Sequence, residues 1–193
     1  RMLEQAGHTV RVINLINPSQ KGNWKSIHYW MDCVREFQFW LFKKKYFSKL
    51  TNKAYSIKDI NLPKSDVTVV GSDQVWNPTQ NYCIEPYFLS FVRQGKRISY
   101  AASIGIENLT SKEQRDYKKW LGNYDAISVR EESARCLLMK LTGREIAKVA
   151  DPTFLLELDY WKAMAVKPIQ ENYILLFTLS YEVSLVEYGK RLA

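Results

Sequence analysis

The chain has few residues of the kinds that build metal and disulfide sites. Its 193 residues include three cysteines, Cys33, Cys83 and Cys136, and two histidines, His8 and His28. The cysteines are odd in number, far apart and without CxxC spacing, so they indicate neither a disulfide framework nor a zinc site. We therefore expect no metal site, and we expect the protein in a reducing, cytoplasmic location.

Long apolar runs and the common nucleotide-binding fingerprints are missing as well. No stretch approaches about eighteen uninterrupted apolar residues, and no signal peptide is visible, which argues against a transmembrane helix or a secreted chain. Neither GxGxxG nor GxxxxGK[ST] occurs, which excludes the usual dinucleotide and P-loop sites. Hydrophobic residues nevertheless make up 46% of the chain, enough for a packed core.

Positive charge is abundant and unevenly placed. The net charge is +8, which favours an anionic partner. Residues 21–64 hold ten lysines and arginines against three acidic residues, and within them residues 37–47 interleave aromatics with three consecutive lysines. Residues 25–50 are predicted to form a helix. Either one face of this helix packs on a sheet while the lysines face solvent, or the excess aromatics and lysines contact an anionic membrane surface.

Strand-like and helix-like segments alternate along the chain. Strands are predicted at 9–15, 66–71, 97–103, 126–130 and 145–150, and helices at 25–50, 110–124 and 131–143. This alternation predicts an α/β domain with a mainly parallel sheet over residues 1–165. Apolar and polar residues hardly alternate within 66–71, which predicts a strand covered on both faces. Residues 166–193 read as a linker and the start of a second domain, with a strand at 172–180, and both chain ends look like cuts in a longer protein.

Polar clusters follow three of the predicted strands. They are GSDQVWNP (71–78), SIG (103–105) and REES (130–133). Because ligands of open parallel sheets bind outside the carboxyl ends of the strands, these clusters predict a binding site. An arginine such as Arg130 can hold an anionic group through two parallel hydrogen bonds. The candidate catalytic residues are Arg130 and Asp73, and the candidate substrate-binding residues are Gly71, Ser72, Gln74, Asn77, Ser103 and Gly105.

Each cluster also has a purely structural interpretation. Gly71 could permit a tight turn, and Ser72 and Asp73 could be turn or helix-capping residues. Asn77 stands before Pro78, which favours a turn, and Trp76 could pack against the sheet. Arg130 could pair with one of the acidic residues that follow it. Three clusters at one sheet edge favour the binding site, since three structural explanations would otherwise have to coincide.

Five segments resemble one known family. They are VVGSDQVWNP (69–78), YFLSFV (87–92), KRISYAASIG (96–105), AISVREESA (126–134) and VADPTFLL (149–156). They occur in the order typical of the polysaccharide pyruvyl transferase family, and the resemblance is close over about residues 66–161. It implies a GT-B-like architecture of two domains, in which this chain supplies a Rossmann-like first domain without its first strand and only the beginning of the second.

The resemblance also implies an activity. Members of the family transfer a carboxyethylidene group from phosphoenolpyruvate to sugar hydroxyls of bacterial surface polymers, with no metal or redox cofactor. Arg130 matches a family arginine near the anionic groups of the donor. The family's catalytic histidine and lysine belong to the second domain, so His8 and His28 are not their replacements, and the chain alone is expected to be inactive.

The implied partners follow from that reaction. They are phosphoenolpyruvate and a sugar or lipid-linked oligosaccharide acceptor, with no nucleic acid and with residues 37–47 as the segment that would contact a membrane. Two alternatives remain at this stage. The protein could be a nucleotide-sugar-dependent transferase on the same scaffold, or a catalytically inactive binding module, because a fold does not fix a function.

Overall fold

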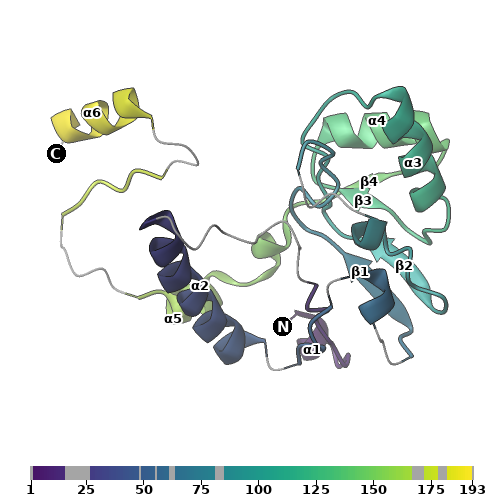
Figure 1. Cartoon of the computed structure of the whole chain (residues 1–193), viewed down its shortest axis with the longest axis horizontal. Helices are drawn as coiled ribbons and strands as arrows, with labels where there is room; N and C mark the ends of the chain where they lie inside the picture. Colours follow the sequence, from purple (N-terminus) through teal and green to yellow (C-terminus); the bar gives the residue numbers. More distant parts are fainter. Residues whose placement is uncertain are drawn as a thin grey trace. The chain divides into compact units, whose positions relative to one another are not determined.

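A computed structural model describes residues 2–15, 27–47, 49–54, 56–60, 64–80, 85–166, 172–177 and 182–192 (Figure 1). The chain forms two compact units, Arg1–Leu156 and Glu157–Ala193. The first contains α1 (Met2–Gln5), α2 (Ile27–Tyr46), β1 (Val67–Val70), β2 (Lys96–Ser99), α3 (Ser111–Leu121), β3 (Ser128–Val129), α4 (Glu132–Thr142) and β4 (Ala147–Lys148). The second contains α5 (Leu158–Met164) and α6 (Val183–Leu192). The α/β class predicted from the alternating segments is confirmed.

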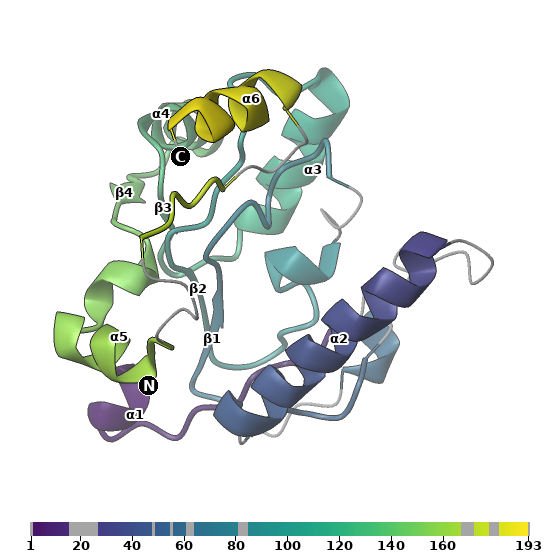
Figure 2. The same cartoon turned by 90° about the vertical axis from the view of Figure 1, so that its left-hand side faces the viewer.

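The strands pair in parallel, as predicted. β1 pairs with β2 and β3 pairs with β4, and the paired β1 and β2 lie side by side in Figure 2. Isolated parallel bridges between Ile98 and Ala126, and between Ala102 and Val129, connect the β2 segment to the β3 segment. The carboxyl ends of these strands therefore point to a common edge, which is the feature that positions the candidate site.

Several strands are shorter than the sequence predicts. The segment expected at 97–103 forms β2 only as far as Ser99, because Ala101 has φ +52°, outside the extended region, before Ala102 pairs again. The segment expected at 145–150 contributes only the two residues of β4. The segment expected at 9–15 forms no named strand and makes isolated parallel bridges from Val12 and Leu15.

Two further strand predictions are wrong. Residues 172–177 of the segment expected at 172–180 form no strand, and residues 178–180 lie outside the described residues. An apolar sequence becomes a strand only where another strand takes up its hydrogen bonds, and none pairs with 172–177 in the described part of the chain. β1 is not covered on both faces, because Val67 and Val69 are exposed while Thr68 and Val70 are buried.

The helices agree well with the sequence. α3 begins with a capping box, in which the Thr110 hydroxyl accepts from the Glu113 backbone N–H and the Glu113 carboxylate accepts from the Thr110 N–H. α4 ends at Gly143 in the left-handed conformation. α2 ends at Tyr46 rather than near residue 50. α3 and α4 contact each other and lie together beside β3 and β4 (Figure 1).

The core forms around Trp76, which is fully buried as predicted for a packing residue. Its ring stacks on Phe88 with centroids 5.4 Å apart and meets Tyr124 edge-on at 5.8 Å. The Trp76 indole N–H donates to the Tyr87 carbonyl at 2.9 Å, and the Tyr117 hydroxyl donates to the Trp76 carbonyl. These contacts fix the loop after β1 to the helix layer, so the polar residues beside Trp76 are held at the sheet edge.

Candidate functional site at the strand ends

Parallel pairing brings the three polar clusters to one edge of the sheet. Asp73 bridges Ala102, and Ala102 bridges Val129. The Ser103 backbone N–H donates to the Asp73 carbonyl at 2.8 Å, and the Arg130 N–H donates to the Ala102 carbonyl at 3.1 Å. The residues that follow three separate strands, Asp73, Ser103 and Arg130, are therefore neighbours in space, as the sequence predicts.

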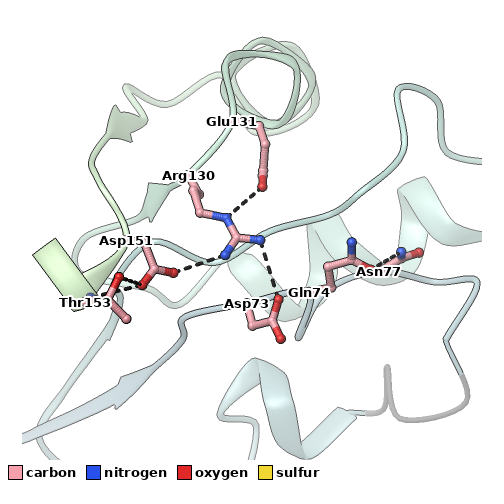
Figure 3. Close-up of polar contacts among 7 residues, drawn as sticks. All are labelled: Asp73, Gln74, Asn77, Arg130, Glu131, Asp151 and Thr153. Carbon is pink, nitrogen blue, oxygen red and sulfur yellow. Dashed lines mark hydrogen bonds and ion pairs between the residues drawn. The ribbon is translucent and has the colours of Figure 1, made fainter. Parts of the chain in front are cut away.

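The Arg130 guanidinium forms the centre of this edge (Figure 3). Its Nε donates to Glu131 Oε1 at 3.0 Å, Nη1 donates to Asp151 Oδ2 at 3.1 Å, and Nη2 lies 3.5 Å from Asp73 Oδ1. The hydrogen bond to Glu131, with further contributions from Asp151 and Asp73, raises the pKa of Arg130. Each nitrogen of the guanidinium therefore faces a different carboxylate, and the structural pairing expected for Arg130 is present.

Asp151 is the carboxylate most firmly fixed in the cluster. Its Oδ1 accepts from the Thr153 backbone N–H at 3.0 Å and from the Thr153 hydroxyl at 2.9 Å, and its side chain is only 19% exposed. The backbone N–H of Thr153 is the largest cause that lowers the pKa of Asp151, and the side chains of Thr153, Arg130 and Ser72 lower it further. Asp151 is therefore an ionised anchor that orients Arg130 at neutral pH.

The Asp73 side chain is held less firmly than that of Asp151. Its side chain is 78% exposed, and the long contact with Arg130 is its one ion pair among the described residues. Its backbone is fixed, since its carbonyl accepts from the Ser103 and Val75 N–H groups at 2.8 Å each. The side chain contacts Arg130 rather than capping a helix, so the helix-cap interpretation of Asp73 is wrong.

Gln74, Asn77 and Gly105 form a second, adjoining group. Asn77 Nδ2 donates to Gln74 Oε1 at 2.9 Å, while Asn77 Oδ1 accepts from the backbone and the hydroxyl of Thr79. The turn predicted at Asn77 is therefore present. A Cβ on Gly105 would stand 2.7 Å from Asn77 Nδ2, so the backbone of residue 105 lies directly against this amide pair.

The remaining candidates also lie at this edge. A Cβ on Gly71 would stand 2.1 Å from the Tyr100 carbonyl oxygen, which excludes any larger residue at the end of β1. Ser72 contributes to the hydrogen bonding of Asp151. The Ser103 hydroxyl is buried and has no hydrogen-bond partner among the described residues. All eight candidate residues, Asp73 included, thus lie at this edge.

The sequence interpretation did not assign a role to Asp151 and Thr153. The sequence does contain a signal for Asp151. This residue directly follows the predicted strand at 145–150, just as the three polar clusters follow theirs. In the structure Asp151 ties the segment after β4 to Arg130 after β3.

In parallel α/β sheets ligands commonly bind outside the carboxyl ends of the strands, and an arginine at that edge can hold an anionic group. The sequence model of the polysaccharide pyruvyl transferase family matches residues 1–191. The chain therefore belongs to the polysaccharide pyruvyl transferase family, and this membership implies a transferase with a polysaccharide acceptor. Comparisons with curated proteins and with solved structures found no match.

Proposed function

We propose that this protein takes part in transferring a carboxyethylidene group from phosphoenolpyruvate to a sugar of a bacterial surface polysaccharide, and that Arg130 binds the donor. The observation that carries the proposal is the Arg130 guanidinium, which the Glu131 and Asp151 carboxylates contact at 3.0 and 3.1 Å while Nη2 has only a long contact. Phosphoenolpyruvate carries a phosphate and a carboxylate, the groups that a guanidinium fork recognises.

The proposed reaction forms a cyclic ketal from two sugar hydroxyls. The methylene carbon of the donor takes up a proton, and the first hydroxyl oxygen bonds to the neighbouring carbon and loses its proton. The bond between that carbon and the phosphate oxygen then breaks, and its electron pair leaves with phosphate. The second hydroxyl oxygen bonds to the same carbon and loses its proton. The two sugar hydroxyls together release two protons. The methylene carbon takes up one proton, and the other leaves with phosphate or goes to solvent.

The neighbouring residues have proposed roles in the same chemistry. Asp73 is a base placed to accept a proton from a sugar hydroxyl. Gln74 and Asn77 offer amide groups to the acceptor, and Ser72 and Ser103 offer hydroxyls. Gly71 and Gly105 let the backbone approach the substrates closely. In Figure 3 the Gln74–Asn77 amide pair lies to the right of the Asp73 carboxylate, and we propose these groups as the acceptor surface.

The proposed site is completed by a second domain. In a GT-B-like arrangement, residues 1–165 form a Rossmann-like first domain and residues 166–193 lead into the next one. The described groups that contact Arg130 are carboxylates, and none of them is a histidine or a lysine. We expect the proton donor for the methylene carbon and the positive charge around the leaving phosphate to come from the second domain.

A contact with an anionic membrane surface is also proposed, through residues 37–47. Phe37 and Trp40 stack on each other on α2 with side chains 58% and 52% exposed. Lys43, Lys44 and Lys45 follow them, and Lys44 lies over the Trp40 ring. Exposed aromatics beside a lysine run suit the interface of an anionic bilayer. No helix in the described ranges is long and apolar enough to cross a membrane.

Replacement of Arg130 by lysine tests the donor assignment. Arg130→Lys keeps the charge but loses the planar fork, so we expect phosphoenolpyruvate binding to weaken by about 1.5–3 kcal/mol, the range of a hydrogen bond to a charged group. Isothermal titration calorimetry with the folded variant measures this loss. Arg135→Lys is the matched control, because Arg135 lies on α4 and pairs with Glu132 rather than with the carboxylates that contact Arg130.

Two results would contradict the proposed function. If Arg130→Lys binds phosphoenolpyruvate as tightly as the parent and has the same melting temperature, Arg130 is a structural residue only. If the parent binds nucleotide sugars and not phosphoenolpyruvate, the chain belongs to a transferase with a different donor.

A further inference from the structure

We propose that Asp73 occupies the donor's position on Arg130 in the free protein and that the donor anion displaces it. The inference rests on the proposed function, because it takes Arg130 as the donor-binding residue. It adds that Asp73 makes a negative charge necessary for binding at Arg130 and that Asp73 becomes available to the acceptor only after the donor has bound.

The three carboxylates around Arg130 are not equivalent, and their differences single out Asp73. Glu131 and Asp151 lie 3.0 and 3.1 Å from the guanidinium, whereas Asp73 lies 3.5 Å away. The Asp151 carboxylate has Thr153 as a second partner. The Glu131 side chain is 33% exposed and the Asp73 side chain 78%. Asp73 is thus the carboxylate that an incoming anion can replace at the lowest cost.

The backbone of Asp73 allows its carboxylate to move while its position stays fixed. The residue bridges Ala102 and its carbonyl accepts two backbone N–H groups, so the main chain is held by the sheet. Only rotation of the short side chain is needed to separate the carboxylate from Nη2. The motion that frees Arg130 is therefore a change of side-chain rotamer rather than a rearrangement of the loop.

Displacement would select among ligands. A neutral sugar has no charge with which to replace Asp73 on Arg130, whereas a phosphate has up to two negative charges and three acceptor oxygens. Glu131 and Asp151 remain in place and keep the guanidinium oriented. Once displaced, the Asp73 carboxylate is free to accept a hydrogen bond from a sugar hydroxyl, so the donor is expected to bind before the acceptor.

The test is the substitution Asp73→Asn. Asparagine has nearly the same shape and tolerates the positive φ of +65° at this position. Removing the competing charge should tighten binding of phosphoenolpyruvate and of inorganic phosphate by about two- to fivefold at low salt, the range expected for one exposed ion pair. The matched control is Asp159→Asn, which removes an equal charge from an exposed pair of the same length with Lys162 and should leave binding unchanged.

A double-mutant cycle separates competition at Arg130 from a general charge effect. In an Arg130→Gln background the Asp73→Asn substitution should produce no gain, since the position for which Asp73 competes is lost. Calorimetry measures all four affinities, and melting temperatures confirm folding.

The possible outcomes distinguish this inference from the proposed function. If Arg130→Gln weakens phosphoenolpyruvate binding but Asp73→Asn binds no more tightly than the parent, displacement is wrong and the donor assignment stands. If the gain persists without Arg130, displacement is wrong as well. If Arg130→Gln binds phosphoenolpyruvate as the parent does, the proposed function itself fails, and this inference with it.

Discussion

Position 105 requires glycine for two separate reasons. Its φ is +68°, in the left-handed region, where a residue with a Cβ costs about 1–2 kcal/mol. A Cβ there would also meet Asn77 Nδ2 at 2.7 Å and the Gln74 amide at 3.2 Å. The first reason is local backbone strain, and the second is contact with the proposed acceptor surface. The two can be separated, because another glycine in the chain has only the first.

We expect Gly105→Ala to destabilise the protein more than Gly143→Ala does. Gly143 has the same φ of +68°, but a Cβ there meets nothing within 4 Å. Gly143→Ala should therefore cost about 1–2 kcal/mol of strain, and Gly105→Ala should cost about 1–3 kcal/mol more from overpacking. Urea unfolding curves of the two variants measure the difference. Equal losses would show that the Gln74–Asn77 pair moves aside without cost.

At the scale of single residues, the sequence predicts which side chains gather but not how they pair. The position of Arg130 and Asp73 at strand ends follows from the order of apolar and polar residues, because parallel strands end at a common edge. The partner of Arg130 depends on tertiary structure. Asp151 is 21 residues further along the chain, and it reaches Arg130 only because β4 pairs in parallel with β3.

At the scale of elements, helices were predicted more accurately than strands. A helix forms its hydrogen bonds within one segment, so the cap at Thr110 and the stop at Gly143 were visible in the sequence. A strand depends on a partner elsewhere in the chain. The segment at 172–177 is as apolar as a buried strand, yet it pairs with nothing in the described part of the chain and forms none.

α2 has more apolar surface than one packing face requires. Val34, Phe37 and Leu41 form one stripe at helical spacing, and Phe39 and Phe42 begin another on a different side of the helix. All five side chains are exposed in the structure, as are Trp40 and Phe47. Several aromatics of 37–47 are therefore exposed, whereas the membrane contact itself stays a prediction.

We expect the protein to bind vesicles of phosphatidylcholine and phosphatidylglycerol, and to lose this binding when Lys43, Lys44 and Lys45 are all changed to glutamine. Each lysine near an anionic surface contributes about 1 kcal/mol, so the triple variant should partition about 100-fold more weakly at low ionic strength. Its melting temperature should not change, because the three side chains are exposed. Cosedimentation over a series of salt concentrations measures the binding.

The control for the vesicle experiment removes an equal charge from another helix. Lys112, Lys118 and Lys119 are exposed on α3, and their change to glutamine should leave vesicle binding nearly intact. Similar binding to purely phosphatidylcholine vesicles, or an equal loss in both triple variants, would contradict a specific role for α2. A dimer that dissociates on changing Trp40 to serine, without vesicle binding, would show that a second copy covers this helix instead.

At the scale of the whole molecule, the core and the candidate site belong to one compact unit. The residues of the buried hydrophobic cluster lie between Val70 and Ile146, within the unit Arg1–Leu156. All the groups that contact Arg130 belong to the same unit. The first unit thus contains the proposed donor-binding residue, and the described groups that contact Arg130 are carboxylates.

We therefore expect the 193-residue chain to bind phosphoenolpyruvate without turning it over. Protonation of the methylene carbon needs a general acid, and Asp151, which contacts Arg130, has a pKa lowered by the Thr153 N–H and is ionised at neutral pH. Calorimetry should detect binding that Arg130→Lys weakens, while a phosphate-release assay with a sugar acceptor should show no signal above that of the same variant. Alkaline phosphatase added at the end confirms that the donor is intact. Steady phosphate release by the chain, reduced in Arg130→Lys, would mean that the catalytic groups are already present and that the reaction does not require a second domain.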